Sequence, residues 1–168
     1  MNTEELKSLQ APLKEKYREQ PQSAIVTLRA QGKIGEGISC KVETGRALVE
    51  AGLHPATGGT GLLLCSGDML LEALVACAGV TLNAVATSIG VEIKDATVKA
   101  EGDIDFRGTL GVSKEALVGF KTIRLYFLLN TNASVEQLAT LLKLTERYCV
   151  VYQTINRGTA IETSIKPL

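Results

Sequence analysis

The longest hydrophobic run of the chain extends from Ser66 to Ile89, with the sequence SGDMLLEALVACAGVTLNAVATSI. Small residues are spread through the run, so that no face of a helix built from it is clearly polar. A helix that is apolar on all sides is typical of a protein core rather than of a surface. The pattern therefore predicts a central buried helix that the rest of the chain wraps, with Ser66 as its N-cap, Asp68 in its first turn and Gly90 ending it.

The same run is long enough to cross a membrane, and this alternative has to be weighed. Glu72 and Asn83 lie inside the run, and neither an aromatic belt nor a Lys/Arg flank accompanies it. These features are atypical of a membrane-spanning helix. We therefore expect a core helix and no membrane partner.

Before the run, the pattern predicts a helical arm followed by short strands. Thr3 is a candidate N-cap for an amphipathic arm over residues 1–22, which Pro12 interrupts and Pro21 ends. Glycines at positions 32, 35 and 37 indicate a turn, and the Gly-, Pro- and Thr-rich residues 51–61 indicate a loop. The segments around these turns that are predicted as strands are Ser23–Ala30, Gly37–Glu43 and Gly45–Glu50.

After the run, two strands are predicted on either side of a loop. Apolar and polar residues alternate over Val91–Asp105, and β-branched and aromatic residues fill Phe120–Leu129. The glycine-containing segment Phe106–Gly119 between them indicates a loop.

The last part of the chain predicts two helices and a closing strand. Ser134 and Gln137 have the spacing of a capping box, which opens a helix that runs to about Leu144. Thr145–Asn156 is predicted as a further helix and Gly158–Lys166 as a strand. Strands that are neighbours in sequence favour an antiparallel α+β fold, and the length favours a single domain over residues 1–168.

Composition and charge exclude several function classes. Lys plus Arg and Asp plus Glu each number 18, so the formal net charge is zero. The chain therefore lacks the basic field that binds nucleic acid or an anionic membrane surface. The polar N-terminus has no hydrophobic segment typical of a signal peptide, and we expect a cytoplasmic protein.

Four cysteines are the most chemically active residues of the chain: Cys40, Cys65, Cys77 and Cys149. No pair has CxxC spacing and there is one histidine, which makes a zinc site improbable. A disulfide framework is atypical of a cytosolic chain of this size. Reactive thiols or buried packing thiols remain as the two interpretations.

Cys77 and Cys149 illustrate both interpretations. A cysteine in an alanine-rich buried helix commonly packs as a small hydrophobe, whereas chemistry requires its thiolate. Cys77 lies roughly ten residues into its helix, too far for that helix's dipole to act strongly, so a cation from elsewhere would have to lower its pKa. Cys149, after Arg147, either packs with neighbouring apolar residues or pairs with Cys77 if their Cα atoms lie within about 7 Å. Cys40 is expected to pack within a strand, and His54 is expected to be a loop residue.

Two motifs resemble the OsmC/Ohr family, whose members are organic hydroperoxide resistance and osmotically inducible proteins. The stretch GDMLLEALVACAG resembles the cysteine helix of that family, and TERYCVV resembles its second cysteine motif. The order of elements from about Ser23 onward also fits. The chain departs from the family in one place, because Val150 follows Cys149 where members often have proline.

The resemblance implies an OsmC-like α+β fold, with antiparallel-rich sheets wrapped around the central helices of an intertwined homodimer. It implies a thiol peroxidase that acts on organic hydroperoxides, with Cys77 as the peroxidatic and Cys149 as the resolving cysteine. The thiolate would become a sulfenic acid and then a disulfide, which an external thiol or dithiol reduces. No metal or prosthetic group is required.

The resemblance also implies an arginine paired with a carboxylate near the thiolate. Arg46 is the preferred match, with Arg29 and Arg147 as rivals. Asp68 stands where the family commonly has Glu, but on an ideal helix it lies about 180° from Cys77. Glu72 lies about 140° away and, if buried, needs a partner such as that arginine. Cys65 is additional to the two-cysteine pattern and could compete in disulfide formation.

Two rival functions stay open beside the peroxidase. One is a member of the same fold that binds a small apolar ligand or a partner without peroxidase activity. The other is a structural or stress-associated dimer in which both cysteines only pack.

Overall fold

The computed structural model describes residues 2–5, 8, 10–11, 19, 32–34, 39–43, 48–111 and 113–166. The predicted strand Ser23–Ala30 and most of the predicted arm lie outside these residues. Residues 3–5 are helical, but the cap is Asn2 rather than Thr3. The Asn2 side chain accepts the Glu5 N–H at 2.8 Å, and the Glu5 carboxylate accepts the Asn2 N–H at 2.9 Å. The Thr3 hydroxyl instead donates to the Thr87 carbonyl at 2.9 Å, which joins this turn to the central helix.

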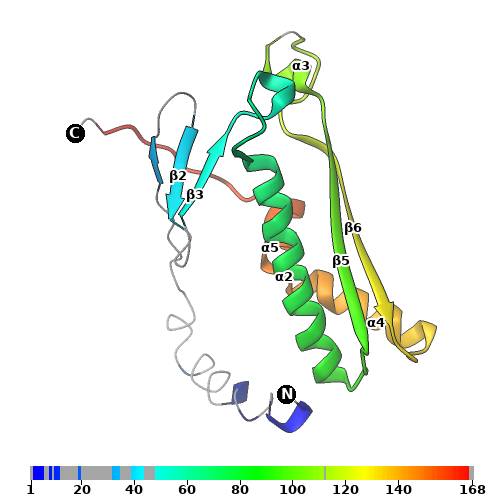
Figure 1. Ribbon diagram of the computed structural model, residues 1–168. Coiled ribbons are helices and arrows are strands. Elements are labelled where there is room, and N and C mark those ends of the chain that lie inside the picture. The colour runs from blue at the N-terminus through cyan, green and yellow to red at the C-terminus, as the bar shows by residue number, and fades with distance from the viewer. Residues whose placement is uncertain are drawn as a thin grey trace.

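Helix α2, Ser66–Ile89, is the central element, as the hydrophobic run predicted. In Figure 1 it lies between the strands β2 and β3 on one side and the long β5–β6 hairpin on the other. Its N-cap is Cys65 rather than Ser66, and this cap makes no side-chain hydrogen bond. The C-terminal prediction is confirmed, because Gly90 adopts φ 72° and the Val91 N–H donates to the Ala86 carbonyl at 2.9 Å.

The first sheet contains four short strands in the order β1-β2-β3-β4: Gly32–Ile34, Ser39–Glu43, Leu48–Gly52 and Leu64–Cys65. The first three pair antiparallel, whereas β3 and β4 pair in parallel. Gly32 therefore lies in a strand and not in the predicted turn. The predicted loop begins later than expected, after Gly52, and contains a short 3-10 turn at Pro55–Thr57.

The second sheet is a long antiparallel hairpin of β5, Asp95–Ile104, and β6, Phe120–Asn130. Both strands were predicted, although β5 begins four residues later than the alternating pattern. The segment between them, predicted as a loop, includes the short helix α3, Phe106–Thr109. Across the hairpin, Arg124 donates to Asp103 at 2.9 Å and to Glu101 at 3.3 Å.

Two helices follow the hairpin and pack against α2. Helix α4, Val135–Tyr148, begins with the predicted capping box of Ser134 and Gln137 and runs further than Leu144. Helix α5, Val150–Arg157, follows it directly. The prediction that Cys149 lies inside one helix is wrong, because its backbone is extended, with φ −73° and ψ 108°, and it separates α4 from α5.

The predicted closing strand Gly158–Lys166 is not formed in the described chain. In Figure 1 this segment runs from α5 toward the side of β2 and β3 without joining a sheet. Its side chains are open, with Ile161 86% and Ile165 99% exposed. A strand requires backbone hydrogen bonds to a neighbour, and the pattern of residues alone does not supply that neighbour.

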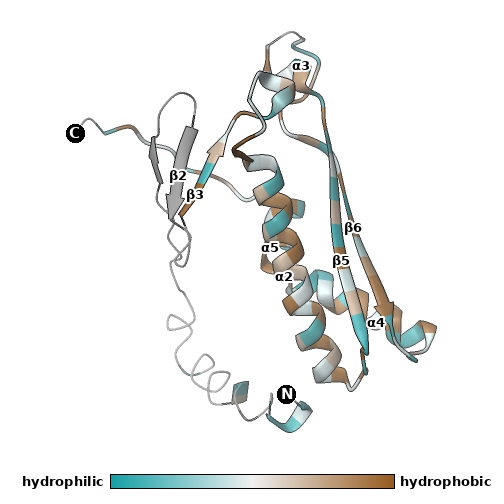
Figure 2. Ribbon diagram, in the orientation of Figure 1, coloured by the Kyte–Doolittle hydropathy of each residue, from teal (hydrophilic) through white to brown (hydrophobic). Residues whose placement is uncertain are grey.

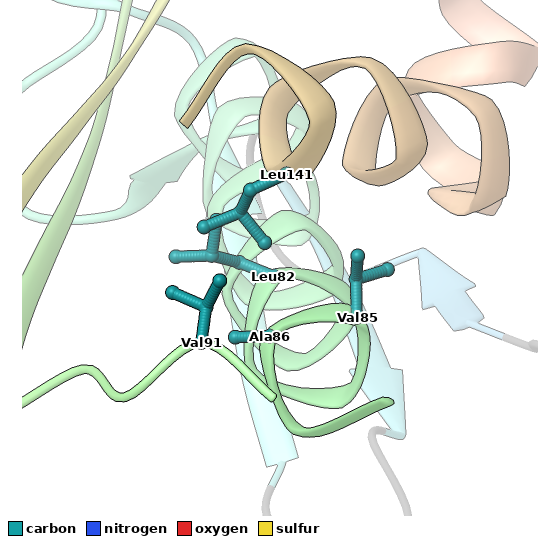
Figure 3. Close-up of a cluster of buried hydrophobic side chains, with 5 residues drawn as sticks. All are labelled: Leu82, Val85, Ala86, Val91 and Leu141. Carbon is teal, nitrogen blue, oxygen red and sulfur yellow. The ribbon is translucent and has the colours of Figure 1, made fainter. Parts of the chain in front are cut away.

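The hydrophobic core lies between the second half of α2 and α4. Leu141 of α4 points toward Leu82 of α2 in Figure 3, and Val85, Ala86 and Val91 complete this cluster. Leu141 is 1% exposed.

The remainder of α2 is covered less completely than predicted. Apolar side chains occur along its whole length (Figure 2), yet Val80 is 73% and Leu70 41% exposed. Among helices of the described chain, α2 alone has the length and apolar composition that would suffice to cross a membrane. Within the described chain, α4, α5 and β5 pack on this helix and leave part of it exposed, so it is less buried than its apolar pattern predicted.

Candidate active site

The fold brings the thiols of Cys77 and Cys149 into contact, so that each affects the ionisation of the other. Cys77 lies in the middle of α2 and is half-buried, whereas Cys149 is 1% exposed. Both are free thiols in this structure, as is Cys65. Two cysteines far apart in the sequence therefore form one pair, because α4 and α5, which Cys149 joins, both pack on α2.

A short network of hydrogen bonds holds the junction at Cys149. The Cys149 N–H donates to the Thr145 carbonyl at 2.9 Å, and this bond closes the last turn of α4. The Cys149 carbonyl accepts the Gln153 N–H at 2.9 Å, and this bond forms the first turn of α5. The Gln153 side chain donates to the Glu146 carbonyl at 2.7 Å and so links the two helices a second time. In this arrangement, N–H groups at the N-terminus of α5 act on the sulfur of Cys77.

The environment of Cys77 favours its thiolate. Burial raises the pKa of Cys77, but the N–H groups of Val151 and Val150, the Cys149 thiol and the Thr81 hydroxyl together hold the pKa below its ordinary value. The first two donors are free backbone N–H groups of the first turn of α5, where the positive end of the helix dipole also lies. Helix N-termini are known to lower the pKa of cysteine thiols.

Cys149 is affected in the opposite direction. Burial raises its pKa, and the neighbouring Cys77 raises it further, against a smaller opposing effect of the Tyr152 and Val151 N–H groups. The pair therefore consists of one thiol whose pKa is lowered and one whose pKa is raised. Such a pair can supply a nucleophilic thiolate and, beside it, a protonated thiol that donates a hydrogen bond.

The sequence predicted that an arginine activates Cys77. Arg46, the preferred candidate, and Arg29 lie outside the described residues. Arg147 is exposed, and its guanidinium lies over the Tyr148 ring, 5.7 Å from the ring centre, rather than at Cys77. Within the described chain, the groups that favour the Cys77 thiolate include backbone N–H groups at the N-terminus of α5, and the prediction of Arg46 lies outside the described residues.

Asp68 and Glu72 are not brought to the thiols. Both side chains are exposed and border a shallow surface cavity with Val75 and Ala100. The argument that Glu72 is buried and needs an ionic partner is wrong, because this side of α2 is open to solvent. For Asp68 the structure agrees with the helical wheel, which places it opposite Cys77.

His54 and Cys65 line a separate cavity of about 340 Å³ at the start of α2. His54 Nδ1 accepts the Ala56 N–H at 3.1 Å, and its ring stacks on Phe106 with a centroid distance of 4.9 Å. His54 is therefore a loop residue, as predicted, and its side chain caps the turn at Pro55–Thr57. No group of three or more His, Cys, Asp or Glu side chains among the described residues is arranged to hold a metal ion.

A more enclosed cavity of about 300 Å³ lies between α2, β6 and the helices α4 and α5. Its wall is mainly apolar and includes Leu74, one turn before Cys77, and Phe127 of β6. Tyr152 and Glu146 supply polar groups, and burial followed by the Glu146 charge raises the pKa of Tyr152. The N–H of the same Tyr152 acts on the Cys149 thiol, although neither thiol is among the residues that line the cavity.

The α5 N-terminus is the functional feature that the sequence did not reveal. Thr145–Asn156 contains neither proline nor glycine, and its apolar residues continue at helical spacing, so nothing marks a break at Cys149. The absence of any Ser, Thr, Asp or Asn at the cap position hides the new helix start. Only the packing of α4 and α5 on α2 creates it.

Comparisons with known proteins agree with this fold. A family model described as OsmC-like protein matches residues 59–164. No curated protein sequence matches the chain.

Solved structures share the fold at low sequence identity. The OsmC-like protein from Mycoplasma pneumoniae has a TM-score of 0.65 at 14% identity, over 78% of this chain and 88% of that one. An organic hydroperoxide resistance protein OsmC from Legionella pneumophila has a TM-score of 0.61 at 17% identity, over 79% and 90% of the two chains. An organic hydroperoxide resistance protein from Elizabethkingia anophelis, with bound thiocyanate, has a TM-score of 0.59 at 20% identity, over 80% and 91%. With the family model covering more than half of its residues, the chain belongs to the OsmC-like protein family.

Proposed function

We propose that this protein is a thiol-dependent peroxidase that reduces organic hydroperoxides to alcohols. The observation that carries the proposal is the contact between Cys77 and Cys149 with pKa values displaced in opposite directions. Family membership and the hydroperoxide resistance proteins among the structural neighbours support a role in peroxide defence.

The reaction follows from the two protonation states. The Cys77 thiolate attacks one oxygen of the hydroperoxide, the O–O bond breaks, and the alkoxide leaves and takes a proton to become the alcohol. Cys77 is then a sulfenic acid. The Cys149 sulfur attacks it, a disulfide forms, and its proton leaves with the hydroxyl as water. A dithiol reductant returns both cysteines to thiols through a mixed disulfide.

Cys77 acts as the peroxidatic residue in this scheme because the N–H groups of Val150 and Val151 stabilise its negative charge. Cys149 acts as the resolving residue because burial keeps it protonated until Cys77 is oxidised. Neither step needs a metal or a prosthetic group. Asp68 and Glu72 carry no assigned role in the described geometry, and Arg46 lies outside the described residues.

The apolar cavity between α2, β6 and the helices α4 and α5 supports an organic hydroperoxide rather than hydrogen peroxide as substrate. Its volume of about 300 Å³ and its apolar wall suit the hydrocarbon part of a fatty or aromatic hydroperoxide. Hydrogen peroxide gains nothing from such a surface, because it has no apolar part to remove from water.

We further propose that the protein works as a homodimer in the cytoplasm. The open apolar side of α2, with Val80 73% and Leu70 41% exposed, is a surface that a second copy would cover. A cytoplasmic location would keep both cysteines reduced between turnovers.

The experiment measures consumption of cumene hydroperoxide with dithiothreitol as reductant. We expect turnover by the parent protein, none by Cys77→Ser, and loss of sustained turnover by Cys149→Ser. Cys65→Ser is the matched control, because its thiol lies at the separate cavity near His54, and it should keep parental activity.

A trapping experiment identifies the cysteine that forms the sulfenic acid. In the Cys65→Ser background, Cys77 is the sole cysteine of the tryptic peptide Ala47–Lys94, so dimedone labelling of that peptide reports its sulfenic acid. Consumption that survives Cys77→Ser contradicts the assignment. A folded parent that neither consumes the peroxide nor forms sulfenic acid at Cys77 leaves the ligand-binding alternative, which the apolar cavity also favours.

A further inference from the structure

The hydroxyl of Thr81 lies one helical turn after Cys77 on the same side of α2. It donates a hydrogen bond of 2.8 Å to the Cys77 carbonyl and is partly buried. In an α-helix that carbonyl already accepts the backbone N–H four residues later, which is the N–H of Thr81 itself. The hydroxyl bond is therefore a second bond to an acceptor that is satisfied without it.

This makes the hydroxyl available for another acceptor. Rotation about its C–O bond redirects the proton without moving any heavy atom. The Cys77 sulfur belongs to the same residue as the carbonyl, and the Thr81 hydroxyl already contributes to lowering the pKa of this thiol. A thiolate is a stronger acceptor than a backbone carbonyl that already has a partner.

We propose that Thr81 is a positioning residue for the reactive thiol, whose hydroxyl donates to the Cys77 carbonyl when Cys77 is a thiol and turns to the sulfur when the thiolate forms. No covalent bond changes in this step, and the only proton that moves away is the one lost by the thiol. The hydroxyl approaches the sulfur from α2 itself, whereas the Val150 and Val151 N–H groups approach it from α5. The thiolate is thus held from two elements.

The neighbouring groups do not duplicate this role. Cys149, at the α4–α5 junction, is the titratable side chain that acts most strongly on Cys77. Glu146 of α4 and Tyr152 of α5 face the adjacent cavity and interact with each other. From β5, Val98 packs at Gly79 and brings no ionisable group there.

The inference rests on Cys77 being the reactive thiol, and the test separates the two ideas. Alkylation of Cys77 by iodoacetamide is followed against pH by mass spectrometry of peptide Ala47–Lys94, in the Cys65→Ser background. Alkylation requires the thiolate, so its midpoint reports the ionisation of Cys77 without any peroxide turnover. Cys149, on the separate tryptic peptide Tyr148–Arg157, is measured in the same samples.

Thr81→Val removes the hydroxyl and keeps the shape, and it should move the Cys77 midpoint to higher pH and slow alkylation near neutral pH about three- to tenfold. Thr81→Ser retains the hydroxyl and should behave like the parent. Thr81→Ala is a second variant without the hydroxyl and should repeat the effect of valine. The thermal midpoint of unfolding is recorded for each variant.

Equal midpoints for the parent, Thr81→Val and Thr81→Ala overturn the role of the hydroxyl. So does a shift in Thr81→Ser as large as that in Thr81→Val, because packing would then be its cause. If Cys77 of the parent is alkylated only in the pH range of an ordinary thiol, near pH 8.5, the proposed peroxidase is contradicted. The profile of the parent alone shows this, whatever the Thr81 variants do.

Discussion

The backbone N–H of Val151, in the first turn of α5, is the group that does most to favour the thiolate of Cys77, half the chain away in sequence. A helix dipole therefore does act on Cys77, but it belongs to α5 and not to α2.

Removal of the Cys149 thiol should make Cys77 less acidic. Cys149→Ala deletes a hydrogen-bond donor to the thiolate, and one hydrogen bond of about 0.5–1.5 kcal/mol corresponds to alkylation slower by about three- to tenfold near neutral pH. The peptide-resolved alkylation profile measures this. Cys149→Ser retains a donor and should lie closer to the parent, and identical profiles for parent and alanine variant would contradict the contact.

Val150→Pro tests the N-terminus of α5 without removing the helix. Val150 is the first helical residue, where proline is favoured, and Cys149 already has the extended backbone that precedes a proline. The side chain of Val150 is 69% exposed, so its loss costs little packing. We expect unchanged helical circular dichroism and slower alkylation of Cys77, because one N–H donor is gone. Val150→Ala keeps that N–H and serves as the control that should leave the alkylation rate unchanged.

Thr145→Val should leave stability unchanged or raise it. The Thr145 hydroxyl is fully buried, at 1% exposure of the residue, and finds no hydrogen-bond partner among the described residues. Replacing an unpaired buried hydroxyl by a methyl group removes its desolvation cost, worth about 1 kcal/mol or more. Urea unfolding measures the change. A clear loss of stability would indicate that the hydroxyl has a partner, such as an ordered water.

Leu141→Ala should lower the free energy of unfolding by about 2–5 kcal/mol, the range for a buried leucine whose site collapses incompletely. Leu141 is 1% exposed and joins α4 to Leu82 of α2. Leu142→Ala is the matched control, because that neighbour is 45% exposed and should cost much less. Since this packing carries Cys149 to Cys77, Leu141→Ala should also shift the alkylation midpoint of Cys77 upward.

Asp105 predicts a pH dependence at the start of α3. Hydrogen bonds from Arg107, first from its side chain and then from its backbone, lower the pKa of Asp105 to about 2. A carboxyl whose pKa is depressed on folding stabilises the protein above its unfolded pKa of about 3.9, and this contribution is lost as the pH falls through the folded pKa. Asp105→Asn should therefore be less stable than the parent at pH 5, and urea midpoints should converge as the pH approaches 2. A constant difference across this range would contradict the ionic origin.

Local signals in the sequence determined most of the elements. The apolar run Ser66–Ile89 has the same bounds as α2, and Gly90 marks the end of this helix. The capping box of Ser134 and Gln137 marks the start of α4. Alternation and β-branched content likewise indicated β5 and β6. Each of these signals acts between residues a few positions apart, which is why it can be read without the fold.

The tertiary structure decided the rest. Whether Gly158–Lys166 becomes a strand depends on a neighbouring strand, and whether Glu72 is buried depends on what covers that side of α2, so neither follows from the residues themselves. The activation of Cys77 is of the same kind. The sequence by itself determined that a cysteine sits in the middle of an apolar helix, beyond reach of that helix's dipole. Only the packing of α4 and α5 on α2 supplied the second thiol and the two backbone N–H groups, because hydrogen bonds to a thiolate require contact in space and not proximity in sequence.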